Sequence, residues 1–134
     1  MNWLVICLGL FSYLLGSVPT GVLVAKSRGI DILNTGSGSI GATNVYRTLG
    51  RGPGFFVFVL DLLKGLIPAL LAPIWFTDTI FPFGIGLCAM IGHTLSPWLK
   101  FKGGKGIATG VGALLGSIPL VAAAGLTCFL ITVF

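Results

Sequence analysis

The sequence predicts an all-α protein, a polytopic bundle of membrane-spanning helices. Two observations support this fold class: 55% of the 134 residues are hydrophobic and only 8% are charged, and the mean hydropathy is +1.06. Such a composition is typical of membrane proteins. A third observation is that the charged residues gather in short loops between long apolar stretches. We therefore treat the chain as a single transmembrane domain, residues 1–134.

The first apolar stretch covers residues 2–25 and contains no charged residue. A helix of about 20 apolar residues crosses a bilayer core of about 30 Å, so this stretch is long enough to span. Lys26 and Arg28 follow it, whereas a cleaved signal peptide carries its basic residues in front of the apolar part. We expect the stretch to be retained.

Further apolar stretches cover about residues 53–76, 79–99 and 106–134. As one helix the last would be about 43 Å long, well beyond the hydrocarbon thickness. The sequence GSIP at 116–119 interrupts it, because proline favours a helix start and disfavours helix in the residue before it. We expect a short glycine-rich helix ending at Ser117 and another starting at Pro119. The chain then holds about five segments.

The basic residues predict the orientation of the chain. The turn around Thr77 and Asp78 carries no lysine or arginine. The loops on the other side hold seven of the eight basic residues: Lys26, Arg28, Arg47, Arg51, Lys100, Lys102 and Lys105. The positive-inside rule therefore places both basic loops in the cytoplasm and the N-terminus outside.

The first basic loop, NTGSGSIGATNVYRTLGRG at 34–52, combines glycines, hydroxyl groups and cations. Its GSGSIG matches the spacing of a dinucleotide-binding motif, but that motif requires a preceding strand, and here a membrane helix precedes it. The residues at 42–49 predict a short helix ended by Gly50. Glycines let the backbone approach an anion, and free N–H groups at a helix start attract one. With Ser37, Ser39 and Arg47, the loop is a predicted phosphate site.

The second basic loop, LKFKGGKGIATG at 99–110, repeats this chemistry. It is not a Walker A motif, because Gly106 follows Lys105 where that motif has serine or threonine. Two such loops on one side predict either a doubly anionic ligand or two phosphate-bearing ligands. The alternative is that both are ordinary cytoplasmic loops attracted to anionic lipid head groups.

Three polar residues inside the apolar segments are further candidates. Asp61 and Lys64 are three apart on one helix, and unpaired charges in lipid are costly, so we expect them to face inward. They form either a structural ion pair or a pair that brings Lys64 near a substrate phosphate. For His93 we favour a packing or loop-orienting role. No cysteine spacing suggests a metal site.

Three segments, GSGSIGATNVYRTLG, LDLLKGLIPALLA and GHTLSPWLKFKGGKGIATG, resemble in order and spacing the bacterial acyl-phosphate:glycerol-3-phosphate acyltransferase family, PlsY. The resemblance implies a bacterial inner-membrane enzyme of seven helices, of which this chain holds the N-terminal two-thirds. It implies transfer of a fatty acyl group from acyl phosphate to the 1-position of sn-glycerol 3-phosphate, giving lysophosphatidic acid on the cytoplasmic side. Besides these substrates and the bilayer, no cofactor, metal, nucleic acid or protein partner is expected.

Position by position, the resemblance assigns catalytic roles to Ser37, Arg47 and Lys105. Asp61, Lys64 and His93 are taken as supporting residues. Ser39 stands where the family usually has asparagine. The remaining expected contacts to substrate phosphate are Gly36, Gly38, Ser39, Gly41, Asn44, Gly103 and Gly104.

The family's third motif would lie beyond Phe134, so we expect a C-terminally truncated chain whose activity on its own is in question. Because acyl phosphate is already activated, we expect direct attack by the glycerol hydroxyl without a covalent acyl-enzyme. Two other functions remain. One is a truncated, non-catalytic homologue. The other is an organophosphate transporter, which the position of the loops disfavours, because transporter sites normally lie near mid-membrane between repeated halves.

Overall fold

The computed structural model describes residues 2–118, 125 and 127, and this part of the chain is helical, without strands. The all-α prediction is confirmed. Short 3-10 turns η1 (Ile32–Asn34), η2 (Ala72–Ile74) and η3 (Pro97–Leu99) lie between the helices. The helices are α1 (Asn2–Ser17), α2 (Thr20–Lys26), α3 (Ala42–Leu49), α4 (Arg51–Leu71), α5 (Ile80–Thr94) and α6 (Ile107–Ser117).

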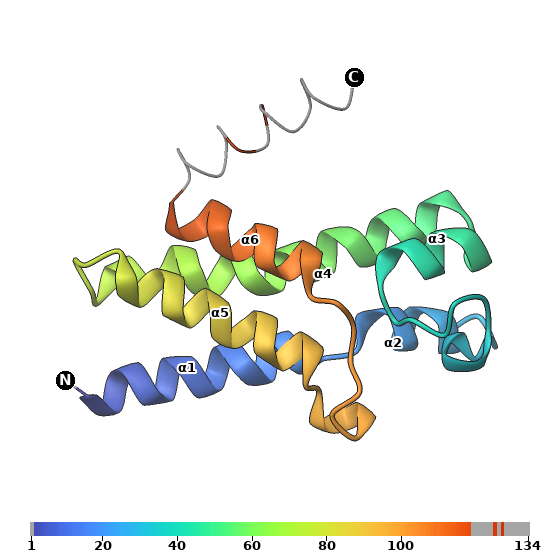
Figure 1. Ribbon diagram of the computed structural model, residues 1–134, viewed down its shortest axis with the longest axis horizontal. Coiled ribbons are helices and arrows are strands. Elements are labelled where there is room, and N and C mark those ends of the chain that lie inside the picture. Colours follow the sequence, from blue (N-terminus) through green and yellow to red (C-terminus); the bar gives the residue numbers. More distant parts are fainter. Residues whose placement is uncertain (1, 119–124, 126, 128–134) are drawn as a thin grey trace.

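Three segments of the described chain are long and apolar enough to cross a membrane: Trp3–Lys26, Arg51–Ile74 and Ile80–Leu99. α6 is apolar but shorter. It ends at Ser117, as the GSIP sequence predicts, whereas the helix expected from Pro119 lies outside the described residues. α1, α4, α5 and α6 run side by side along the long axis, and α2 and α3 lie toward one end (Figure 1).

The first span is not one continuous helix, because it breaks between α1 and α2 at Val18 and Pro19. Proline has no N–H to donate and its ring clashes with the preceding turn, so the helix breaks here and the carbonyl groups at its end lose their helical partners. In a membrane these must be satisfied within the protein. The Ser96 hydroxyl donates to the carbonyl of Ser17 (2.6 Å), and the Lys64 ammonium donates to that of Val18 (2.5 Å).

Small residues let the long helices pack closely. A methyl group on Gly16 of α1 would overlap the backbone of Ala89 in α5, and one on Gly65 of α4 would overlap the carbonyl of Thr109 in α6. Helices in lipid associate through such contacts, since the surrounding acyl chains are themselves apolar. Large apolar side chains point outward instead: Trp3, Phe55 and Ile107 are each more than two-thirds exposed. This pattern suits a bundle surrounded by lipid.

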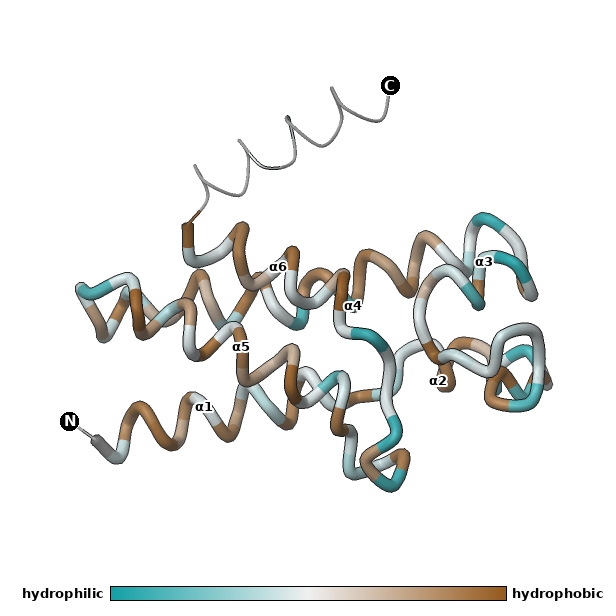
Figure 2. The backbone as a smooth tube through the Cα atoms, in the orientation of Figure 1, coloured by the Kyte–Doolittle hydropathy of each residue, from teal (hydrophilic) through white to brown (hydrophobic). Residues whose placement is uncertain are grey.

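Hydrophilic segments gather at the end where α2, α3 and their loops lie and in the loop between α5 and α6, as the colouring in Figure 2 shows. α5 ends and α6 begins beside this region, joined by the second basic loop. The packing of α4 against α3, α5 and α6 therefore brings residues from both basic loops together.

Candidate functional site

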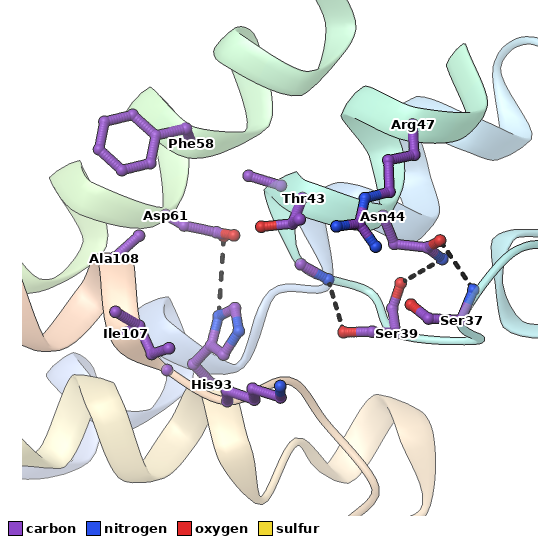
Figure 3. A pocket seen from close by; sticks show the side chains of 14 residues that line it. Ser37, Ser39, Thr43, Asn44, Arg47, Phe58, Asp61, His93, Ile107 and Ala108 are labelled. Atoms are coloured by element: carbon purple, nitrogen blue, oxygen red, sulfur yellow. Dashed lines mark hydrogen bonds and ion pairs between the residues drawn. The ribbon is translucent and has the colours of Figure 1, made fainter. Parts of the chain in front are cut away.

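A pocket of about 430 Å³ lies where the two basic loops meet the bundle (Figure 3). The starts of α3 and α6 form two of its walls, and α4 and α5 contribute the side chains of Asp61 and His93. The residues lining it are Ser37, Ser39, Gly41, Ala42, Thr43, Asn44, Arg47, Phe58, Asp61, His93, Lys105, Gly106, Ile107 and Ala108.

The structure thus brings together most of the residues that the sequence singled out. These are Ser37, Ser39, Gly41, Asn44, Arg47, Asp61, His93 and Lys105. The other candidates, which do not line this pocket, are Gly36, Gly38, Lys64, Gly103 and Gly104. Phe58 was missed by sequence reasoning, although it lies one turn before Asp61 on the same face of α4. The other lining residues that were not singled out are Ala42, Thr43, Gly106, Ile107 and Ala108.

Asn44 organises the first glycine loop. Its Oδ1 accepts a hydrogen bond from the N–H of Ser37 (3.0 Å), and its Nδ2 donates to the carbonyls of Ser39 (2.8 Å) and Thr35 (3.0 Å). Gly36, at φ 64°, passes so close to the Asn44 amide that a methyl group there would collide with it. In this structure Asn44 and Gly36 therefore shape the loop, and their predicted contact with phosphate stays a prediction.

α3 begins at Ala42 and ends at Leu49 with Gly50 at φ 95°, as the sequence predicts. Within the described chain, the N–H groups of Ala42 and Thr43 at its start make no hydrogen bond. Arg47 extends from the same helix beside Thr43 and Asn44 (Figure 3). It lines the pocket, is exposed, and makes no ion pair with any described residue. An anion bound at this wall would therefore meet the Arg47 cation and the free backbone N–H groups at the start of α3.

The second glycine loop is held against the end of α5. Gly103 N–H donates to the carbonyl of Thr94 (2.9 Å), and Gly104 N–H donates to that of His93 (3.1 Å). A methyl group on either glycine would overlap His93. These glycines thus dock the loop and place Lys105 in the pocket wall. Both N–H groups are engaged by these carbonyls, and the predicted contact of the two glycines with phosphate stays a prediction.

Asp61 and Lys64 form the expected inward-facing ion pair, with Lys64 Nζ 2.8 Å from Asp61 Oδ1 and both side chains buried. Asp61 lines the pocket, whereas Lys64 lies behind it and bonds the Val18 carbonyl. Of the two roles left open for Lys64, this geometry favours the structural one. His93 is buried too, and its backbone carbonyl anchors Gly104, which fits the predicted loop-orienting role.

An apolar groove of about 520 Å³ adjoins the pocket between α3 and α4 and shares Ala42, Thr43 and Phe58 with it. Tyr46 and Phe55 line its other side. A pocket that contains charged and hydroxyl side chains and adjoins an apolar groove suits an amphipathic ligand, because each half of the ligand meets a matching surface.

A family model described as glycerol-3-phosphate acyltransferase matches residues 6–134 of the chain. The chain belongs to the glycerol-3-phosphate acyltransferase family. It is 52% identical over 121 residues to the glycerol-3-phosphate acyltransferase of Geotalea daltonii, covering 90% of this chain and 62% of that relative. It is 55% identical over 109 residues to that of Geobacter metallireducens, covering 81% and 56%.

The fold is shared with solved glycerol-3-phosphate acyltransferases. A crystal structure of PlsY (YgiH), an integral membrane glycerol 3-phosphate acyltransferase, in its glycerol 3-phosphate form matches with a TM-score of 0.87 and 44% identity, over 94% of this chain and 64% of that one. The lysophosphatidic acid form matches with a TM-score of 0.83 and 44% identity, over 92% and 61%. The chain therefore spans about three-fifths of the length of these relatives, and its integral membrane fold is confirmed.

Proposed function

We propose that this chain forms the phosphate-binding part of a bacterial membrane enzyme that acylates the 1-hydroxyl of sn-glycerol 3-phosphate with acyl phosphate as donor. The observation that carries the proposal is the pocket where the starts of α3 and α6 converge with Arg47 and Lys105. Membership of the family and the likeness to PlsY solved with glycerol 3-phosphate support the acceptor substrate.

The pocket supplies what a phosphate dianion needs. Arg47 and Lys105 provide two positive charges from separate segments of the chain, and the hydroxyl groups of Ser37 and Ser39 add hydrogen-bond donors. Charge-assisted hydrogen bonds of this kind are about twice as strong as neutral ones. The apolar groove beside Phe58 offers the acyl chain a place next to the phosphate-binding walls.

The reaction needs positioning and charge stabilisation more than covalent chemistry. The glycerol 1-hydroxyl oxygen attacks the acyl carbonyl carbon and forms the ester bond, the bond from that carbon to the phosphate oxygen breaks, and phosphate leaves. Arg47 and Lys105 stabilise the negative charge on the departing phosphate. The hydroxyl proton has to leave during attack, and a substrate phosphate oxygen is one candidate acceptor.

The proposed activity is tested by release of inorganic phosphate from a long-chain acyl phosphate by the full-length gene product in lipid. Release is expected to depend on glycerol 3-phosphate and to be accompanied by lysophosphatidic acid formed in equal amount. Phosphate release that is independent of glycerol 3-phosphate would indicate a simple hydrolase. Transport of glycerol 3-phosphate into sealed vesicles without acylation would support the organophosphate transporter instead.

The proposed site requires both basic loops on the cytoplasmic side. We expect Arg51→Cys and Lys102→Cys, each in a background without native cysteines, to resist a membrane-impermeant thiol reagent in intact cells and to react after permeabilisation. Both positions are exposed, so burial within the protein does not protect them. Labelling from outside would reverse the orientation inferred from the positive-inside rule.

A further inference from the structure

A buried acid and a buried base form an ion pair inside the bundle. Asp61 and Lys64 are almost fully buried on a membrane-spanning helix, where a pair of apolar side chains is often as stable. The two residues are not placed alike. Lys64 does not line the pocket, whereas Asp61 lines it and faces the ring of His93 (Figure 3).

Two donors hold the Asp61 carboxylate in position, one from its own helix and one from α2. Lys64 Nζ donates to its Oδ1 at 2.8 Å, and the Thr20 hydroxyl donates to the same oxygen at 2.5 Å. Lys64 also donates to the carbonyl of Val18, which lies at the break before α2 and accepts a second hydrogen bond from the N–H of Thr20 (3.0 Å). The break in the first span therefore affects the pocket, because the Val18 carbonyl at the break positions Lys64, and Lys64 holds the Asp61 carboxylate.

His93 faces this carboxylate with an unpartnered nitrogen. Its Nδ1 is fully buried, lies 3.7 Å from Asp61 Oδ1, and makes no hydrogen bond within the described residues. Gly104 packs against the opposite nitrogen, Nε2. His93 lines the pocket while its Nδ1 is buried, so the ring meets the pocket through its other edge. This separation is just beyond hydrogen-bond distance, and hydrogen bonds that are long in a free enzyme often tighten only when substrate is bound.

We propose that Asp61 is a positioning residue for His93. Held by Lys64 and Thr20, its carboxylate keeps the proton of the neutral imidazole on Nδ1 and leaves Nε2 as a hydrogen-bond acceptor at the pocket wall. The nitrogen of a histidine that carries the proton is set by the hydrogen bond it makes. The free Nε2 then accepts a hydrogen bond from a substrate hydroxyl. This last step rests on the proposed acyltransferase function, whereas the tautomer does not.

The tautomer is measured directly, because His93 is the one histidine in the 134-residue chain. With ¹⁵N-histidine incorporated, NMR spectra of the chain in lipid nanodiscs at a pH where the ring is neutral are expected to show the Nδ1–H tautomer. In the double variant Asp61→Leu with Lys64→Met, the Nε2–H tautomer is expected to gain population. Replacing both partners leaves no unpaired buried charge, so the fold is retained. Asp78→Asn, in the exposed turn at the far end, is the matched control and leaves the spectrum unchanged.

Activity provides the second measurement. In the full-length gene product, the double variant is expected to lower kcat by about 100-fold, the size of effect produced by misplacing a group in the site, with KM for glycerol 3-phosphate little changed. A wild-type spectrum with the proton on Nε2, or a double variant whose tautomer matches wild type, overturns the proposal. If wild type shows the Nδ1–H tautomer but no acyl transfer, the proposed function fails and the positioning of His93 by Asp61 stands.

Discussion

Arg47→Ala is expected to lower acyl transfer by the full-length gene product by about 10²–10³-fold, the effect seen when a group that stabilises developing negative charge is removed. Arg47 lines the pocket and is not neutralised by any described acidic residue, so its charge is available to substrate phosphate. The measurement is the rate of phosphate release that depends on glycerol 3-phosphate, at saturating and at limiting concentrations.

Arg28→Ala is the matched control for this substitution. It removes the same charge from an exposed residue of the same loop region, but Arg28 does not line the pocket. We expect its activity to stay close to wild type. Equal losses in the two variants would mean that both arginines act only through attraction to anionic lipid head groups.

Gly65→Ala is expected to destabilise the bundle by about 1–3 kcal/mol, the usual penalty for overpacking a tight interface. The added methyl group would overlap the carbonyl of Thr109 and the backbone nitrogen of Ala113, so α6 has to move away from α4. Because α6 begins at the pocket, acyl transfer should fall as well. The measurement is the midpoint of thermal unfolding of the chain in one detergent.

Gly84→Ala provides the comparison on another membrane helix. Gly84 lies within α5, and a methyl group there would meet no atom within 4 Å. Alanine is the better helix former by about 1 kcal/mol, so we expect an unchanged or slightly higher midpoint. If Gly65→Ala behaves like Gly84→Ala, close packing between α4 and α6 does not limit stability.

The local features of this protein can be predicted from sequence because their causes lie within a few neighbouring residues. Uninterrupted apolar residues are enough to predict the spans, Gly50 is enough to end α3, and the sequence around Ser117 is enough to end α6. Clustered cations beside glycines were enough to identify the two loops, since charge and backbone freedom are properties of the residues themselves. The break at Pro19 was missed, although proline signals it, because the apolar run continues through it.

Only the tertiary structure decided which polar groups meet. Asp61 and His93 lie on separate helices, and no periodicity relates them, so their contact depends on how α4 and α5 pack. The hydrogen bonds by which Asn44 shapes its loop, to the N–H of Ser37 and the carbonyls of Thr35 and Ser39, likewise depend on how the loop folds over α3. Sequence determined which residues carry charge, which stretches can span, and where α3 and α6 end. Packing determined their partners, because a hydrogen bond is made with whichever group the fold brings within about 3 Å.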